Sequence, residues 1–190
     1  MQVPSTLSDE TRSKMTKLRD RYPHVKSAVL PCLYLLQAEK GYCTDAGIND
    51  IAEILSMVPA DVFSTASFYT MIYKEPVGKK VIDVCTNLAC MVNGADQIVE
   101  YLSATLKTPI ESVSPDGRCC VRRAECLGYC DRAPVMQIDY RPFGPLTTSE
   151  IDRIILEEHL TADSGPEENG VETSSVDLSG TRINDLDSGR

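Results

Sequence analysis

Four of the eight cysteines form two closely spaced pairs, and this spacing constrains the chain more than any other feature of its sequence. Cys85 and Cys90 are separated by four residues, Cys126 and Cys130 by three, and 35 residues lie between the pairs. Each pair sits where a predicted strand ends. Two loops therefore supply four thiolates, the soft ligands that suit zinc or an iron–sulfur centre.

The spacing within each pair bears on which metal is held. Four cysteines from two loops are what a [2Fe–2S] cluster requires, and each pair can hold one iron. Gly128 lets the second loop turn sharply and brings its backbone N–H groups near sulfur. Structural zinc sites usually use C-x2-C pairs, and a disulfide oxidoreductase uses C-x-x-C at a helix start. Neither pattern occurs here, so the spacing favours iron–sulfur, with zinc and unligated thiols as the alternatives.

Composition and charge exclude several classes of protein. The longest apolar run, Ala28 to Leu36, has nine residues, whereas a membrane helix needs roughly 20. The net charge of −9 argues against nucleic acid as a partner. The first residues show no signal peptide, so we expect a cytoplasmic chain with reduced thiols. In that compartment eight cysteines indicate metal binding or catalysis rather than a disulfide framework.

Helical patterns fill residues 1–75, which we expect to form a helical bundle. Ser8 can cap a first helix that ends near Pro23, and a second runs from about Ser27 to Lys40. Thr44 can cap a third helix, and Pro59 can open a fourth. Their apolar residues recur at helical spacing.

The pattern changes after residue 75, and we expect residues 76–160 to form a small α/β domain. Strands are predicted at Lys80 to Val84, Cys119 to Ala124 and Val135 to Ile138. A helix over residues 95–106 follows the first strand, and a capping box at Thr147 opens another. This order is compatible with a thioredoxin-like layer. Residues 161–190 hold seven acids and two arginines, and we expect them to form a disordered acidic tail.

Several ordered sequence blocks resemble the E subunit of NADH:quinone oxidoreductase, the [2Fe–2S] subunit beside the flavin subunit of respiratory complex I. The resemblance covers about residues 18–160. The blocks are Tyr22-Pro23, Ala66-Ser67-Phe68-Tyr69-Thr70, Pro76-Val77-Gly78, Cys85-Thr86-Asn87-Leu88-Ala89-Cys90, Gly94-Ala95, Pro115-Asp116-Gly117, Glu125-Cys126-Leu127-Gly128-Tyr129-Cys130 and Ala133-Pro134-Val135-Met136.

The resemblance implies an α+β chain with an N-terminal helical bundle and a thioredoxin-like [2Fe–2S] ferredoxin domain. The family's ligands fall on Cys85, Cys90, Cys126 and Cys130, and none of them is catalytic. The family's cluster exchanges single electrons with FMN on a partner subunit that oxidises NADH. The implied place is the peripheral arm of complex I, on the cytoplasmic side of a bacterial inner membrane, without membrane insertion.

The resemblance leaves two other interpretations open. A related subunit serves the diaphorase module of NAD(P)-linked hydrogenases and formate dehydrogenases, and the sequence does not separate it from its complex I equivalent. A zinc-stabilised adaptor without redox function is the alternative from another class. No G-x-G-x-x-G is present, so we expect any NADH site to lie on another chain.

The other cysteines have simpler interpretations. The chain departs from the family at Cys119-Cys120, where we expect one core thiol and one exposed thiol, because strand neighbours point to opposite faces. Cys32 and Cys43 are expected to be small core residues.

Two further hypotheses concern the surroundings of the cluster. Arginines near the second pair, Arg122, Arg123 and Arg132, are candidates for tuning the reduction potential. By resemblance, Pro134 is a candidate for a cis peptide bond.

Overall fold

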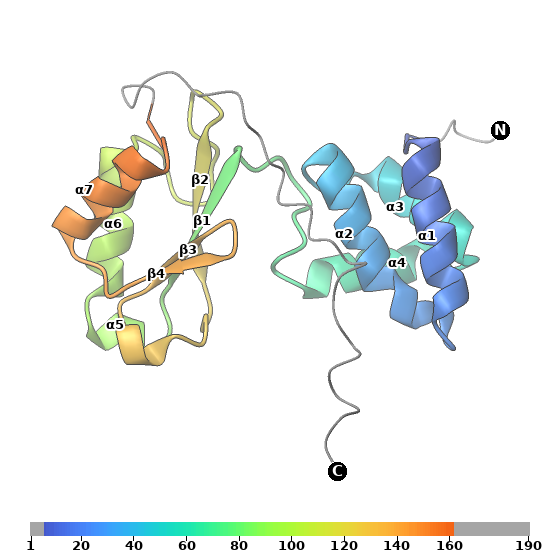
Figure 1. Cartoon of the computed structure of the whole chain (residues 1–190), viewed down its shortest axis with the longest axis horizontal. Coiled ribbons are helices and arrows are strands. Elements are labelled where there is room, and N and C mark those ends of the chain that lie inside the picture. The colour runs from blue at the N-terminus through green and yellow to red at the C-terminus, as the bar shows by residue number, and fades with distance from the viewer. Residues whose placement is uncertain (1–5, 162–190) are drawn as a thin grey trace, which may run out of the picture.

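The computed structural model describes residues 6–161, which form a group of helices and a sheet with its own helices. A connector, residues 69–79, runs between the two groups (Figure 1). The predicted acidic tail lies outside the described residues, apart from Thr161.

Four helices make up the first group, as the sequence predicts. They are α1 (Asp9–Arg21), α2 (Val29–Lys40), α3 (Asp45–Leu55) and α4 (Pro59–Phe68), with a 3₁₀ turn at Val25–Ala28 before α2. The second helix begins two residues later than predicted. Pro31 explains the shift, because its ring would clash with the carbonyl of Ser27 if that residue were already inside the helix.

The four helices enclose one apolar core. Its largest fully buried side chains come from three of the helices: Met15, Leu33, Leu36, Ile51 and Leu55. Gly47 of α3 faces Leu36 of α2 so closely that a Cβ would overlap the leucine side chain, which shows how near the two helices approach. Cys32 and Cys43 are buried in this core, as predicted.

The second group is a four-stranded sheet with helices on one face. Its strands are β1 (Lys80–Cys85), β2 (Cys119–Ala124), β3 (Met136–Ile138) and β4 (Arg141–Phe143), in the order β2-β1-β3-β4. β1 and β2 are parallel, while β1 with β3 and β3 with β4 are antiparallel. The helices are α5 (Leu88–Val92), α6 (Ala95–Thr105) and α7 (Thr148–Glu157). The predicted α+β class is confirmed.

Alternation along β1 separates the two faces of the sheet. Ile82 and Val84 are buried in the core shared with α6 and α7, which cover this face (Figure 1). Asp83 and Cys85 therefore point to the opposite face. Asp83 pairs in register with Arg122 of β2, so two charged side chains lie next to each other there.

The sequence did not predict α5 and β4, nor the two 3₁₀ turns, Val25–Ala28 and Cys130–Arg132. The five residues of α5 lie inside the first cysteine loop, too short a stretch to show helical periodicity. Pro142 makes β4 a poor strand by propensity, but β4 is an edge strand, where a missing N–H is tolerated. The turn between β3 and β4 consists of Asp139 and Tyr140, both at positive φ, 47° and 68°.

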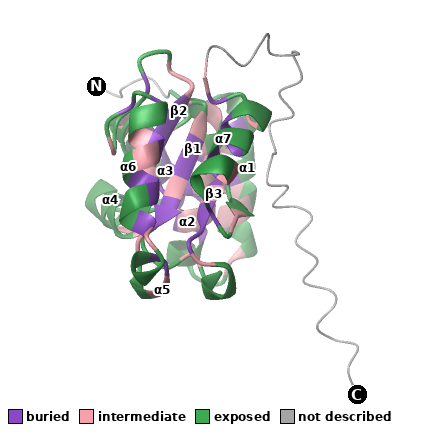
Figure 2. Ribbon diagram, turned by 90° about the vertical axis from the view of Figure 1, so that its left-hand side faces the viewer, coloured by how far each residue is buried: buried purple, intermediate pink, exposed green. Residues whose placement is uncertain are grey.

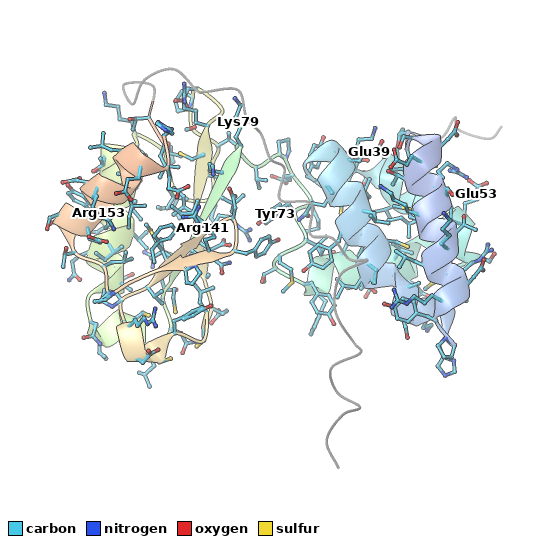
Figure 3. The ribbon with its side chains drawn as sticks, viewed as in Figure 1. Glu39, Glu53, Tyr73, Lys79, Arg141 and Arg153 are labelled. Atoms are coloured by element: carbon cyan, nitrogen blue, oxygen red, sulfur yellow. The ribbon has the colours of Figure 1, made fainter. Side chains whose placement is uncertain are left out.

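The connector is hydrogen-bonded to both groups through Tyr73. The Tyr73 N–H donates to Gln37 Oε1 of α2 at 2.7 Å, and the Tyr73 carbonyl accepts from the Cys43 N–H at 2.7 Å. On the other side, its ring lies 5.0 Å from the Arg122 guanidinium, and its hydroxyl shares a hydrogen bond with Tyr140. Tyr73 thus stands between the helices and the sheet (Figure 3).

Among the described residues, no single helix is long and apolar enough to cross a membrane. α3 and α4 reach that length and apolar composition only when they are taken together, and the chain bends by 120° between them.

Candidate iron–sulfur site

The first cysteine pair is buried where β1 ends. Cys85 is the last residue of β1, and its N–H donates to the Val135 carbonyl at 3.1 Å. Cys90 lies in α5, which folds back over the strand end. The two residues are 2% and 1% exposed and pack against Ala95 and Val135. The protein therefore keeps this pair away from water.

The second pair lies on the surface, in the loop after β2. Cys126 and Cys130 are both exposed, and their Sγ atoms are 3.8 Å apart. Gly128 sits between them at φ 83°, a conformation that other residues adopt with strain. The end of the sheet where α5 lies is mostly exposed in Figure 2. The two pairs thus differ sharply in their access to solvent.

The 3.8 Å separation fits two thiolates on one metal. A tetrahedral metal bound about 2.3 Å from each sulfur holds the two sulfurs about 3.8 Å apart. Cys126 and Cys130 therefore have the spacing that one iron of a cluster requires, without rearrangement of the loop.

The two pairs come together at one end of the sheet. Burial raises the pKa of Cys90 to about 11, and its thiol is also hydrogen-bonded to Cys85. The neighbouring Cys126 thiol raises the pKa of Cys130, to which the Cys85 charge also contributes. Cys85 lies opposite Ala124 in the register of β1 and β2, so the loops that carry the two pairs leave the same end of the sheet side by side.

Within the described residues, no three His, Cys, Asp or Glu side chains converge on a point suited to one metal ion. A two-iron core does not require such convergence, because each iron takes one pair of cysteines.

Short contacts join the two ligand loops, and nothing in the sequence indicated them beyond adjacency to the cysteines. The Thr86 N–H and hydroxyl both donate to the Ala124 carbonyl, at 3.0 and 3.2 Å. Asn87 accepts from the Leu88 N–H at 2.8 Å, and its side-chain amide donates to Glu125 at 3.3 Å. These bonds fix the start of one loop against the start of the other.

The three arginines proposed to tune the potential are all paired with acids. Arg122 lies 3.6 Å from both Asp83 and Glu111. The other two pairs are Arg123 with Asp96, at 2.6 Å, and Arg132 with Asp131, at 3.5 Å. These acids offset the arginine charges, so the arginines raise the potential at the cluster site less than unpaired cations would.

A model of the thioredoxin-like [2Fe-2S] ferredoxin family matches residues 15–159. The chain belongs to this family. The match covers both the helices and the sheet, and it contains all four predicted ligands of this ferredoxin.

Curated relatives of the ferredoxin are named as E subunits of NADH-quinone oxidoreductase. The relative of Rhizobium meliloti, numbered 2 among such subunits, is 32% identical over 76% of this chain and 86% of its own length. The relative of Mycobacterium tuberculosis is 36% identical over 71% of this chain, but this chain spans only 54% of it. The relative of Pseudomonas aeruginosa is 29% identical over 78% of this chain.

A solved structure shares the fold of the ferredoxin. A chain of an NAD+-reducing [NiFe]-hydrogenase, crystallised in the H2-reduced state, superposes with a TM-score of 0.59 at 23% identity. The superposition covers 70% of this chain and 23% of the hydrogenase chain. At this identity the likeness concerns the fold alone.

The remaining cysteines of the ferredoxin lie away from the site. Cys119 packs in the core under α6 and α7, and Cys120 points to the other face. Both are buried, so the expectation that one is exposed is wrong. A bridge between Val113 and Cys120 also lays the preceding segment along the edge of β2. The peptide bond before Pro134 is cis, as suggested by resemblance.

Proposed function

We propose that this chain is the [2Fe–2S] electron-transfer subunit of an NADH:quinone oxidoreductase, with its cluster on Cys85, Cys90, Cys126 and Cys130. The observation that carries the proposal is that the two cysteine loops start side by side where β1 and β2 end. The names of the curated relatives support the assignment to this complex.

The protein's own part is to hold and partly shield the cluster, which when bound supplies one-electron transfer. The inner pair, Cys85 and Cys90, is buried and excludes water from one side. The outer pair, Cys126 and Cys130, leaves the other side at the surface, where a redox partner can approach. The thiols must lose their protons to bind metal, so cluster insertion releases protons, including that of Cys90.

We further propose that FMN and the NADH site lie on a partner subunit, in the peripheral arm of the complex on the cytoplasmic side of the membrane. Hydride carries two electrons, whereas a [2Fe–2S] centre takes one, so a flavin must stand between NADH and the cluster. In this proposal residues 1–75 are the helical domain and residues 76–160 the cluster domain.

The equivalent diaphorase subunit of an NAD(P)-linked hydrogenase or formate dehydrogenase is the second candidate. The hydrogenase chain of the same fold favours keeping it. Co-expression with the flavin subunit of each kind of complex separates the two, since the complex acts either on quinone or with a hydrogenase or formate dehydrogenase subunit. The zinc adaptor has less support, because the chain belongs to a family of [2Fe-2S] ferredoxins.

Metal analysis after anaerobic purification tests the proposal. We expect about two irons and two sulfides per chain, with a reduced-state EPR signal from one spin-½ centre. The isolated, flavin-free chain should not reduce ferricyanide with NADH, and the co-expressed complex should. Stoichiometric zinc without iron, or enzyme-like NADH oxidation by the isolated chain, would refute the assignment.

A further inference from the structure

We propose that Cys126 and Cys130 form a reversible disulfide when the chain meets a disulfide oxidant before its cluster is inserted. The outer pair is then a redox-controlled modification site that decides whether the chain can accept iron. The inference rests on the ligand assignment proposed above, but the formation of the bond itself can be tested without a cluster.

The geometry of the outer pair permits the bond. The two Sγ atoms are 3.8 Å apart and both residues are exposed. The S–S bond of a disulfide is about 2.05 Å long, so the two Sγ atoms must move about 1.8 Å closer together. Both lie in the surface segment after β2 with Gly128 between them. Cys130 begins a 3₁₀ turn, Cys130–Arg132, and neither cysteine belongs to a strand. Closure therefore moves a loop and leaves the sheet unchanged.

The other six cysteines are poor competitors, and all eight lie within the described residues. Cys32 and Cys43 are enclosed in the helical core, where burial raises the pKa of each to about 12. A thiol that stays protonated does not attack a disulfide. Cys119 and Cys120 are neighbours on one strand, with side chains on opposite faces.

The inner pair is protected by burial. Cys85 and Cys90 lie close together but are only 2% and 1% exposed, so an oxidant from solution cannot reach either sulfur. Burial thus selects one pair among the eight thiols.

The chemistry is thiol–disulfide exchange with a small disulfide such as oxidised glutathione. The thiolate of one outer cysteine attacks a glutathione sulfur, forming a mixed disulfide and releasing one glutathione thiol. The second outer cysteine then attacks the sulfur of the first and releases the other glutathione. The two cysteines lose two electrons and two protons, which leave as two glutathione thiols, and a dithiol reductant reverses the reaction.

The bond would block cluster insertion because both outer sulfurs cease to be thiolates. The inner pair alone supplies two ligands, whereas the two irons need four. An inserted cluster would in turn keep the outer sulfurs from reacting. The cluster and the disulfide are therefore mutually exclusive.

The test uses the full chain, stripped of its cluster by a chelator under anaerobic reducing conditions and then exposed to oxidised glutathione. Free thiols are alkylated, and the bonds are mapped by mass spectrometry. We expect one bond, between Cys126 and Cys130, and none in the cluster-loaded chain treated in the same way. Upon addition of ferrous iron and sulfide, the oxidised chain should take up at least about tenfold less iron than the reduced chain, until dithiothreitol restores uptake.

Two variants distinguish the possible failures. Cys126→Ser should give no intramolecular bond, whereas Cys120→Ser should form the same bond as the parent chain. If no Cys126–Cys130 bond or a mixture of pairs forms, while the reduced chain assembles its cluster, the present inference fails. If reduced Cys126→Ser assembles a cluster with the parent's spectrum, the ligand assignment itself fails.

Discussion

Water reaches two of the four proposed ligands, and replacing one of these by serine tests the assignment with little disturbance of the core. Cys126→Ser offers an alkoxide, a harder ligand than a thiolate, so we expect a lost or shifted EPR signal. Cys120→Ser is the matched control, since Cys120 is buried on the open face of the sheet away from the ligand loops. An unchanged spectrum in Cys126→Ser with a lost cluster in Cys120→Ser would show that the second pair was wrongly chosen.

Glu39 links the start of α1 to α2 through hydrogen bonds, and protonation of Glu39 in acid weakens this contact. Burial opposes its ionisation, but hydrogen bonds from Thr11, Lys40 and Ser8 together lower the pKa of Glu39 to about 2. Because the folded-state pKa is depressed from an ordinary 4.5, the stabilisation is complete above pH 4.5 and is lost as the pH falls towards 2.

We therefore expect Glu39→Gln to lower the free energy of unfolding by about 2 kcal/mol at neutral pH, measured by urea denaturation. The difference from the parent chain should shrink as the pH falls below 4.5. Glu53→Gln is the control, since Glu53 is 64% exposed and makes one ion pair, of 3.9 Å, with Arg12 (Figure 3). A difference for Glu39→Gln that is independent of pH would contradict the assignment.

At the scale of elements, Gly78 sets how closely the start of β1 approaches β2. A Cβ at this position would lie 2.6–2.7 Å from backbone atoms of Cys119. That backbone cannot move aside, because Lys80 donates to the Arg118 carbonyl at 2.8 Å and Lys79 to the Gly117 carbonyl at 3.1 Å. We expect Gly78→Ala to cost about 2 kcal/mol of stability by thermal or urea unfolding.

Gly47→Ala provides the comparison for that substitution. The added methyl would meet side-chain atoms of Leu36 rather than backbone, and alanine favours the helix by about 1 kcal/mol over glycine. Its net effect should be smaller than that of Gly78→Ala. If Gly47→Ala and Gly78→Ala lowered the free energy of unfolding equally, the backbone contact between Gly78 and Cys119 would not limit the approach of β1 to β2.

The sequence predicted elements where a local interaction defines their ends. Ser8, Thr44 and Thr147 each accept a backbone N–H three residues later, at 3.2, 3.1 and 3.2 Å, as capping residues do. The β3–β4 turn was missed because Asp139 and Tyr140 are not the usual Asn-Gly pair. Tyr140 is held there by its contact with Tyr73, a partner 67 positions away that no local pattern reveals.

The spacing and the resemblance point to four cysteines, whose two loops start side by side at the ends of β1 and β2. The difference in burial between the two pairs was not predictable from the sequence. The burial of Cys85 and Cys90 depends on α5 and on Val135, which come together only in the folded chain. The sequence also did not predict the acidic partners of Arg122 and Arg123, because these residues too come together only in the folded chain.

Across the whole molecule, Arg122 fixes the connector against the sheet. Its guanidinium donates to the Thr70 carbonyl at 3.1 Å, lies over the Tyr73 ring and pairs with Asp83 and Glu111. Arg122→Gln leaves the mostly buried Asp83 without its cation, which should cost about 3 kcal/mol. We expect faster protease cleavage and faster hydrogen exchange in residues 70–75, with an unchanged cluster spectrum.

Arg153→Gln is the matched control for Arg122→Gln. Arg153 also pairs with two acids, Glu150 and Glu157, but all three lie on the exposed face of α7 (Figure 3). Exposed pairs contribute about 0–1 kcal/mol, so this variant should leave the connector unchanged. Equal cleavage of the connector in both variants would show that Arg122 does not fix it.

The separation of the two cores also bears on the order of events during synthesis. All members of the helical core lie between Leu7 and Ile72, so this part can pack while the rest of the chain is still inside the ribosome. The sheet cannot finish packing until later, because its core includes residues up to Leu160. Cys85 therefore leaves the ribosome well before α7 can close the fold around the sheet. We expect a nascent chain stalled near residue 135 to carry folded helices and an inner cysteine pair that is outside the ribosome and still open to the cell's thiol chemistry.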